Sequence, residues 1–422
     1  MPKWGEFTVA STHGKPSDPG EAGRRERIRG QVKIIVDALD DVAVAPGATD
    51  DIADFAHLYR RQHILVRDDD LSRVTQEFDE PRDDDPVVTW RISDGLVNGI
   101  TRLELGADDD VLVVLDRLDR VLGVGVASPD QVVWVTPSGC CPATEPEEPA
   151  GDVVVPTPNL RPDDGKGVFV SVVDTGWHTP SATEPLTPFL AGVTGDEETI
   201  DPDHIHPYAG HGTFIAGVVR CQARHAEVRV EGFLTNGGAI YESEIIRQLC
   251  DALALGPDII SLSAGTVTRG NRPSLAFEVF HDNFLSQLKG TVLVAAAGND
   301  STRQPFWPAA FPWAVSVGAV DATGTRASFS NFGSWVDVYA LGVDLVNAFP
   351  HGTYTCTEPP NVGQVRHFHG LASWSGTSFA TPVVAGKIAA RMSRTGLSAR
   401  QAADELLAEA RNNAIVGVGA IL

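Results

Sequence analysis

The stretch that decides the fold is Val168-Phe169-Val170-Ser171-Val172-Val173-Asp174-Thr175-Gly176. Its first six residues are almost all apolar, which is typical of a strand buried on both faces of a parallel sheet. The run ends at an acid and a glycine, where the backbone can turn tightly. Three similar apolar runs follow, at 259–262, 292–297 and 315–320. Together they predict a set of buried strands in the second part of the chain.

Helical stretches separate and follow these runs. They lie at about 213–221, 241–255, 273–288, 378–394 and 398–412. Strands that alternate with helices favour the α/β class, because each helix carries the chain back to start the next parallel strand. We therefore expect residues 166–422 to form a doubly wound, mostly parallel sheet with helices on both faces.

The first 165 residues have a different pattern. Residues 1–30 are polar and are interpreted as a tail, and residues 31–136 as a small α/β domain with an antiparallel sheet. Its expected strands lie at 32–36, 63–66, 100–105 and 131–135, with a helix at 108–120. Residues 137–165 are rich in proline and acids, which is typical of a linker.

The composition excludes some classes of function. The 422 residues carry a net charge of −23, and residues 1–150 hold 30 acids against 16 bases. Nucleic acid is therefore not an expected partner, because like charge repels phosphate. No apolar run is long enough to cross a bilayer, so no membrane partner is expected either. The start of the sequence has no signal-peptide pattern, which predicts a cytoplasmic protein, with export by an unconventional route as the alternative.

Five cysteines are too few for a disulfide scaffold and show no metal-site spacing. They are interpreted as free thiols in a reducing compartment. The sequence leaves open a bridge between Cys221 and Cys250.

Four polar segments stand where strands end or helices begin, which is where open α/β sheets bind ligands. They contain Asp174, His211, Asn299 and Ser378. A serine hydroxyl needs a base to become a nucleophile, and that base needs an orienting acid. Each residue alone is more typical of a cap, a core histidine or a turn. Jointly, His211 can activate Ser378, Asp174 can orient His211, and Asn299 can donate to a developing oxyanion.

The motifs around these residues resemble those of the subtilisin-like serine proteases, the subtilase family. They are Asp-Thr-Gly at 174–176, His-Gly-Thr at 211–213 and Gly-Thr-Ser-Phe-Ala-Thr-Pro at 376–382. The resemblance covers about 160–422. It implies a serine endopeptidase that works through an acyl-enzyme, with Asp174, His211 and Ser378 as the triad. It further implies a substrate-binding set made of Ser263, Ala264, Gly265, Ala296, Ala297 and Gly298.

The sequence departs from the family pattern in three places. The calcium loop that usually follows the His-Gly-Thr helix is missing, so neither a metal nor another cofactor is expected. Phe306 and Trp307 stand in the stretch that usually forms the floor of the primary specificity pocket, which predicts that a large side chain is obstructed there. Residues 353–369 form an insertion before the nucleophile, long enough to overhang the cleft.

The expected small domain is similar, over 100–135, to the second half of a subtilase propeptide. This similarity implies a folding aid and inhibitor that is removed on activation. Two alternatives stay open: a permanent module whose acidic surface recruits a protein partner or substrate, and a catalytically silent subtilase used for binding. A sedolisin, which shares Gly-Thr-Ser but uses glutamate as its base, is disfavoured by His211 and Asn299. The expected partner of the site itself is a protein or peptide substrate.

Overall fold

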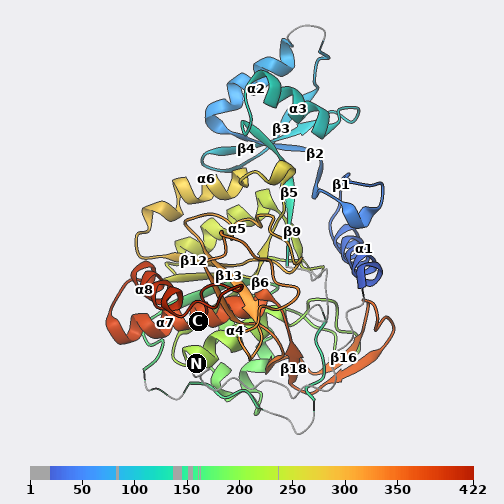
Figure 1. The fold of residues 1–422 in the computed structure, drawn as a ribbon. Helices are drawn as coiled ribbons and strands as arrows, with labels where there is room; N and C mark the ends of the chain where they lie inside the picture. The colour runs from blue at the N-terminus through green and yellow to red at the C-terminus, as the bar shows by residue number, and fades with distance from the viewer. Residues whose placement is uncertain are drawn as a thin grey trace.

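The larger part of the molecule is built on a seven-stranded parallel sheet. In the computed structural model, which describes residues 20–81, 85–135, 145–150, 155–159, 161, 163–235 and 237–422, its strand order is β14-β13-β12-β10-β6-β8-β7 (Figure 1). The strands are β6 (Phe169–Asp174), β7 (Thr194–Gly195), β8 (Glu227–Gly232), β10 (Ile259–Leu262), β12 (Val292–Ala296), β13 (Val315–Val320) and β14 (Val338–Leu341). The predicted apolar runs form the centre of this sheet.

Helices cover both faces of the sheet. On one face lie α4 (His211–Gln222) and α7 (Thr377–Thr395), and on the other α5 (Glu242–Ala254) and α6 (Leu275–Asn283) (Figure 1). The last helix, α8 (Ala399–Asn412), packs beside α7. Each layer buries its own apolar core against the sheet. The predicted doubly wound α/β fold is thus confirmed.

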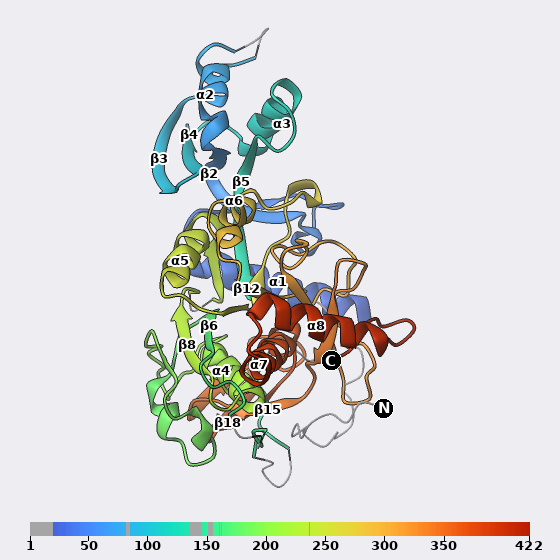
Figure 2. The same ribbon diagram turned by 90° about the vertical axis from the view of Figure 1, so that its left-hand side faces the viewer.

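A second, antiparallel sheet stands above α5 and α6 (Figures 1 and 2). Its elements from the first part of the chain are β1 (Val42–Ala45), β2 (His57–Arg67), α2 (Leu71–Asp79), β3 (Trp90–Val97), β4 (Ile100–Leu105), α3 (Val111–Val121) and β5 (Ala127–Val135). Two short strands from the larger part complete it, β9 (Ala239–Tyr241) and β11 (Ala264–Gly265). The two parts of the chain therefore share one sheet, and β5 is the strand that joins them.

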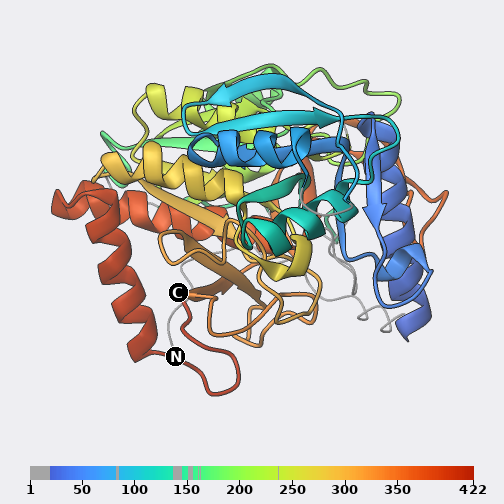
Figure 3. The same cartoon turned by 90° about the horizontal axis from the view of Figure 1, so that it is seen from above.

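The interpretation of residues 20–36 was wrong. Residues 32–36 are not a strand, and residues 20–30 are not part of a polar tail, because both belong to helix α1 (Gly20–Ala38). The run of β-branched residues favours a strand, but Val32, Ile35 and Leu39 recur at helical spacing and are buried together. Packing of this face outweighs strand propensity. Seen from above, α1 stands beside the N-terminal sheet (Figure 3).

The described part of the expected linker is anchored to the larger part of the chain. Glu147 forms an isolated β-bridge with Ser373 of strand β18 (Leu371–Trp374). Strand β18 pairs antiparallel with β15 (Leu345–Ala348). The buried Glu145 carboxylate accepts hydrogen bonds from Tyr354 Oη at 3.0 Å and from Thr357 N at 2.6 Å. These partners lie in the 353–369 insertion, whose strands are β16 (Gly352–Thr355) and β17 (Val365–Phe368). The insertion thus holds the chain just before the larger part begins.

The cysteines, the loop after α4 and the length of the helices were also the subject of predictions from sequence. Cys221, Cys250 and Cys356 are free thiols, so the bridge left open between Cys221 and Cys250 is not formed. Helix α4 ends at Gln222 and β8 begins at Glu227, so only four residues separate them. None of the helices in the described ranges is long and apolar enough to cross a membrane.

Candidate active site

Asp174 and His211 meet at the carboxyl edge of the parallel sheet. Asp174 is the last residue of β6, and His211 is the first residue of α4. His211 Nδ1 lies 2.7 Å from Asp174 Oδ1, and the two side chains are 1% and 0% exposed. Thr175 N also donates to Asp174 Oδ1, at 2.8 Å. The buried carboxylate therefore fixes the orientation of the imidazole.

Ser378 stands at the start of α7, beside this pair. The ring of Phe379, the next residue, lies 5.1 Å from the His211 ring, centroid to centroid. Ser378 Oγ lies 3.4 Å from the carbonyl oxygen of Ser263, while Ser263 Oγ donates to the carbonyl oxygen of Ser378 at 2.9 Å. His211 Nε2 is buried and has no hydrogen-bond partner among the described residues. No hydrogen bond therefore joins this nitrogen to Ser378 Oγ in the structure.

Asn299 follows β12 and faces the start of the same helix. Its Oδ1 accepts a hydrogen bond from Thr377 N at 2.9 Å, which fixes the plane of the amide. Its Nδ2 would lie 3.5 Å from a Cβ placed on Gly376, so it points toward the backbone just before Ser378. The turn that carries Asn299 is braced by Asn331, which donates to the carbonyl oxygen of Ala297 at 2.8 Å. Sequence reasoning did not find this bracing asparagine.

The six predicted substrate-binding residues lie on two segments that flank Ser378. Ser263 precedes β11, which holds Ala264 and Gly265, and the other segment is the end of β12 with Ala297 and Gly298. Strand β5 already occupies the edge of β11: Val135 pairs with Ala264, and Trp134 with Gly265. On its other side β5 pairs antiparallel with β9, and Val135 N donates to the carbonyl oxygen of residue 238 at 2.7 Å. No sequence signal indicated that β9 would pair with the other edge of β5.

A further residue of the site, Glu198, lies behind His211. Glu198 Oε2 accepts a hydrogen bond from Gly210 N at 3.0 Å, and its carboxyl interacts with the Thr175 hydroxyl. The Thr175 hydroxyl in turn accepts from Gly212 N at 3.2 Å. Glu198 thus braces the backbone on both sides of His211. Burial, with a smaller effect of the nearby Asp174 charge, raises the pKa of Glu198 to about 8. In the sequence it belongs to an acidic run typical of a solvated loop, so no signal pointed to it.

Comparison with known proteins matches one family to the part of the chain that carries this site. The family model described as the subtilase family matches residues 165–419, which is more than half of the chain. The chain belongs to the subtilase family. The match leaves residues 1–164 outside the matched region.

Curated subtilases match the same part of the chain. The thermophilic serine proteinase of Bacillus sp. (strain AK1) is 30% identical over 257 residues, which are 57% of this chain and 56% of that protein. Thermitase of Thermoactinomyces vulgaris is 32% identical over 248 residues, which are 56% of this chain and 78% of thermitase. The chain thus spans little more than half the length of the first of these subtilases.

Among solved structures, the prenylagaramide maturation protease PagA matches with 26% identity and a TM-score of 0.47, over 59% of this chain and 84% of that one. A cold-adapted subtilisin-like serine proteinase matches with 24% identity and a TM-score of 0.47, over 62% of this chain and 90% of that one.

The raised pKa of Glu198 makes a stability prediction. Between pH 4.5 and 8 the carboxyl is protonated in the folded protein but ionised in the unfolded chain, so stability falls as pH rises through this window. Glu198→Gln cannot ionise. In a Ser378→Ala background, which prevents self-digestion, urea unfolding will show that the free energy of unfolding falls between pH 5.5 and 8.5 by up to about 3 kcal/mol more with Glu198 than with Gln.

The matched control for this comparison is Glu197→Gln, because Glu197 is the exposed neighbour in the same acidic run. It should leave the pH dependence unchanged. Equal falls in stability with Glu198 and with Gln at that position would contradict the assigned pKa.

Proposed function

We propose that this chain is a serine endopeptidase that cleaves proteins or peptides through an acyl-enzyme on Ser378. The observation that carries the proposal is the buried contact of His211 Nδ1 with Asp174 Oδ1 at 2.7 Å, beside the start of α7. His211 Nε2 takes the proton of Ser378 Oγ as the hydroxyl attacks the substrate carbonyl, and later gives it to the leaving amine. Asp174 stabilises the imidazolium while it exists.

The negative charge that forms on the substrate carbonyl oxygen needs donors. Asn299 Nδ2 supplies one, because Thr377 N holds the other end of the amide. The backbone N–H groups at the start of α7 supply further positive potential. Such donors act most strongly on the transition state, because the charge develops only there.

Ser378→Ala removes the nucleophile and should abolish hydrolysis of a protein substrate such as casein, while circular dichroism shows an unchanged fold. In subtilisin, loss of the nucleophile costs about 10⁶-fold in kcat. Wild-type protein should also take one fluorophosphonate label, at Ser378, and should shed roughly 140–150 N-terminal residues on incubation. The variant should do neither. More than a tenth of wild-type activity in Ser378→Ala would refute the assignment.

Asn299→Ala removes the side-chain donor and should lower kcat by roughly 10²–10³-fold with little change in KM. Asn412→Ala, an exposed asparagine near the end of α8, is the control and should leave both constants unchanged. Steady-state kinetics on a small peptide substrate provide the measurement. A rise in KM at constant kcat would instead make Asn299 a substrate-positioning residue.

We further propose that the N-terminal part of the chain inhibits the enzyme. Strand β5 supports this, because it pairs with β9 and β11 where an extended substrate would add as a strand. Helix α1 covers the same region: Arg24 donates to the carbonyl oxygen of Asp300 at 2.8 Å, and Tyr208 Oη donates to Gln31 Oε1 at 2.6 Å. Asp300 follows Asn299, and Tyr208 lies three residues before His211. A substrate cannot take its place while both elements remain.

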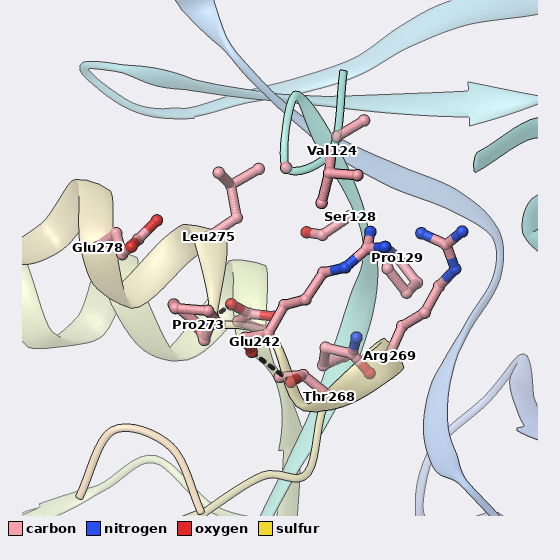
Figure 4. Close-up of a pocket in the computed structure, with 14 residues that line it drawn as sticks. Val124, Ser128, Pro129, Glu242, Thr268, Arg269, Pro273, Leu275 and Glu278 are labelled. Carbon is pink, nitrogen blue, oxygen red and sulfur yellow. Dashed lines mark hydrogen bonds between the residues drawn. The ribbon is translucent and has the colours of Figure 1, made fainter. Parts of the chain in front are cut away.

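Ion pairs hold the N-terminal part on the larger part, and each side contributes both acids and bases. Bases of β2 meet acids of α5 and α6: Arg60 lies 3.1 Å from Glu244, and Arg67 2.7 Å from Glu278. Acids of α3 meet bases on the larger part: Asp119 lies 2.8 Å from Arg269 and 2.6 Å from Arg272. A cavity of about 300 Å³ remains between the two parts, with Glu242, Arg269 and Glu278 among its lining residues (Figure 4).

Two fully buried carboxyls also lie at this interface. Asp130 of β5 accepts from Ser243 N at 2.9 Å and from Ser243 Oγ at 2.8 Å, with Arg102 at 3.9 Å and Arg60 nearby. Glu242 accepts from Ala276 N at 3.1 Å and from the Ser274 hydroxyl, and it feels the charge of Asp130. Burial raises the pKa of Asp130 to about 6 and that of Glu242 to about 7. We take both carboxyls to regain ordinary pKa values when undocking exposes them to water, so that docking takes up protons.

The alternative is a permanent module that recruits a partner. The acidic surface that suggested it is in part already used, because Asp119 pairs with Arg269 and Arg272 of the same chain. We propose inhibition because β5 lies in the cleft itself. Retention of the whole chain in fully active enzyme would favour the module.

The buried carboxyls give inhibition a pH dependence. Because their pKa values are raised when the N-terminal part is docked, docking is strongest below pH 4.5 and weakens as pH rises through 6–7. Glu242→Gln stays neutral and should keep the cleft covered at higher pH. The ratio of wild-type to Glu242→Gln activity on a small peptide should therefore rise about tenfold between pH 5.5 and 8.

Taking this ratio cancels the pH dependence of the catalytic step, which both proteins share. The control is Asp251→Asn, which removes an exposed carboxylate on the same helix. It should give a ratio to wild type that does not change with pH. A flat ratio for Glu242→Gln would contradict proton-linked docking.

A further inference from the structure

We propose that Phe306 closes the pocket beside Ser378, so that the enzyme cleaves after residues with small side chains: glycine, alanine or serine. The residue concerned is the one whose carbonyl carbon Ser378 attacks. This inference rests on the proposed function and names the substrate class of the same site.

The ring of Phe306 lies between the two backbone segments that flank Ser378. A Cβ placed on Gly265 would lie 2.3 Å from Phe306 Cε1, and one placed on Gly298 would lie 3.2 Å from Phe306 Cγ. Both glycines are predicted substrate-binding residues, one on each wall. The ring thus packs against both walls at once and occupies the space between them.

The path of β5 shows which substrate side chain would meet this ring. Trp134 pairs with Gly265, and its ring contacts Phe306 edge-on with a centroid separation of 6.1 Å. Side chains alternate between the two faces of a strand, so positions two residues apart share a face. In a substrate bound along the path of β5, one residue takes the place of Trp134. The residue two positions after it therefore points toward Phe306. Its carbonyl then lies beside Ser263, whose backbone contacts Ser378 Oγ.

Phe306 is held firmly in this place. Its side chain is 0% exposed. The neighbouring Trp307 forms two backbone hydrogen bonds with Thr266, at 2.8 and 2.9 Å, and Ala310 N donates to the carbonyl oxygen of Phe306 at 2.9 Å. These backbone partners belong to the larger part of the chain, whereas the ring itself also packs with Trp134 of β5 and with Val32 and Ile35 of α1.

A large substrate side chain would have to displace this buried ring, whereas a methyl or hydroxymethyl group needs little room. Exclusion by shape acts on bound substrate and transition state alike, and it separates substrates by their kcat/KM. The expected discrimination between an alanine and a phenylalanine at this position is about 100-fold or more.

The test uses the full chain and two chromogenic peptides that differ only in the residue before the scissile bond, alanine or phenylalanine. The ratio of their kcat/KM values does not depend on the fraction of molecules whose cleft is uncovered, since both peptides meet the same open molecules. Wild type should favour the alanine peptide about 100-fold. Phe306→Ala should lower this preference at least tenfold, mainly by gaining activity on the phenylalanine peptide.

Phe280→Ala is the matched control, because Phe280 is an equally buried phenylalanine on α6; its preference should equal that of wild type. If Phe306→Ala does not fold, the wild-type rates on glycine, alanine, leucine and phenylalanine peptides still decide the question. Equal wild-type rates on alanine and phenylalanine peptides, or an unchanged preference in folded Phe306→Ala, would overturn the inference alone. No hydrolysis of any peptide and no fluorophosphonate label on Ser378 would overturn the proposed function, and this inference with it.

Discussion

Main-chain pairing of β5 between β9 and β11 is the interaction on which the rest of the arrangement depends. Two short strands that face each other across a cleft present backbone groups that need partners. A third strand satisfies both edges at once, and β5 does so with Val132–Val135. This pairing joins the N-terminal sheet to the larger part, and the ion pairs and buried carboxyls of the interface assemble around it.

The candidate chemistry depends on a different property of the same molecule. In a parallel sheet all strands end at one edge, so β6 and β12 deliver Asp174 and the turn of Asn299 to one place. Helices α4 and α7 begin at that edge, so their N-terminal ends, which carry partial positive charge, place His211 and Ser378 there. Four residues far apart in sequence thus converge, and two of them directly follow glycines at positive φ: Gly210 (φ 79°) before His211 and Gly298 (φ 96°) before Asn299.

The parallel sheet and the four candidate residues could be predicted from sequence, because the buried strands are continuous apolar runs and the motifs stand at characteristic spacings. Helix α1 could not, since its β-branched run favours a strand and only the burial of one face against Trp134 and Phe306 decides for a helix. Glu198 was also missed, because an acid in an acidic run gives no sign of burial. Phe306 was expected to obstruct a pocket, but its contact with both Gly265 and Gly298 depends on a backbone register that the sequence does not encode locally.

The anchoring of Glu145 on the insertion has a consequence for affinity. Val135 and Glu145 are ten positions apart in the sequence, so β5 is tethered close to the cleft that it fills. A short tether of this kind gives an effective concentration in the millimolar range. A strand with only modest intrinsic affinity therefore saturates the cleft while it is covalently attached. Under the inhibitory role proposed above, one broken peptide bond between Val135 and Glu145 would replace this effective concentration with the free concentration of the fragment, and the occupancy of the cleft would fall.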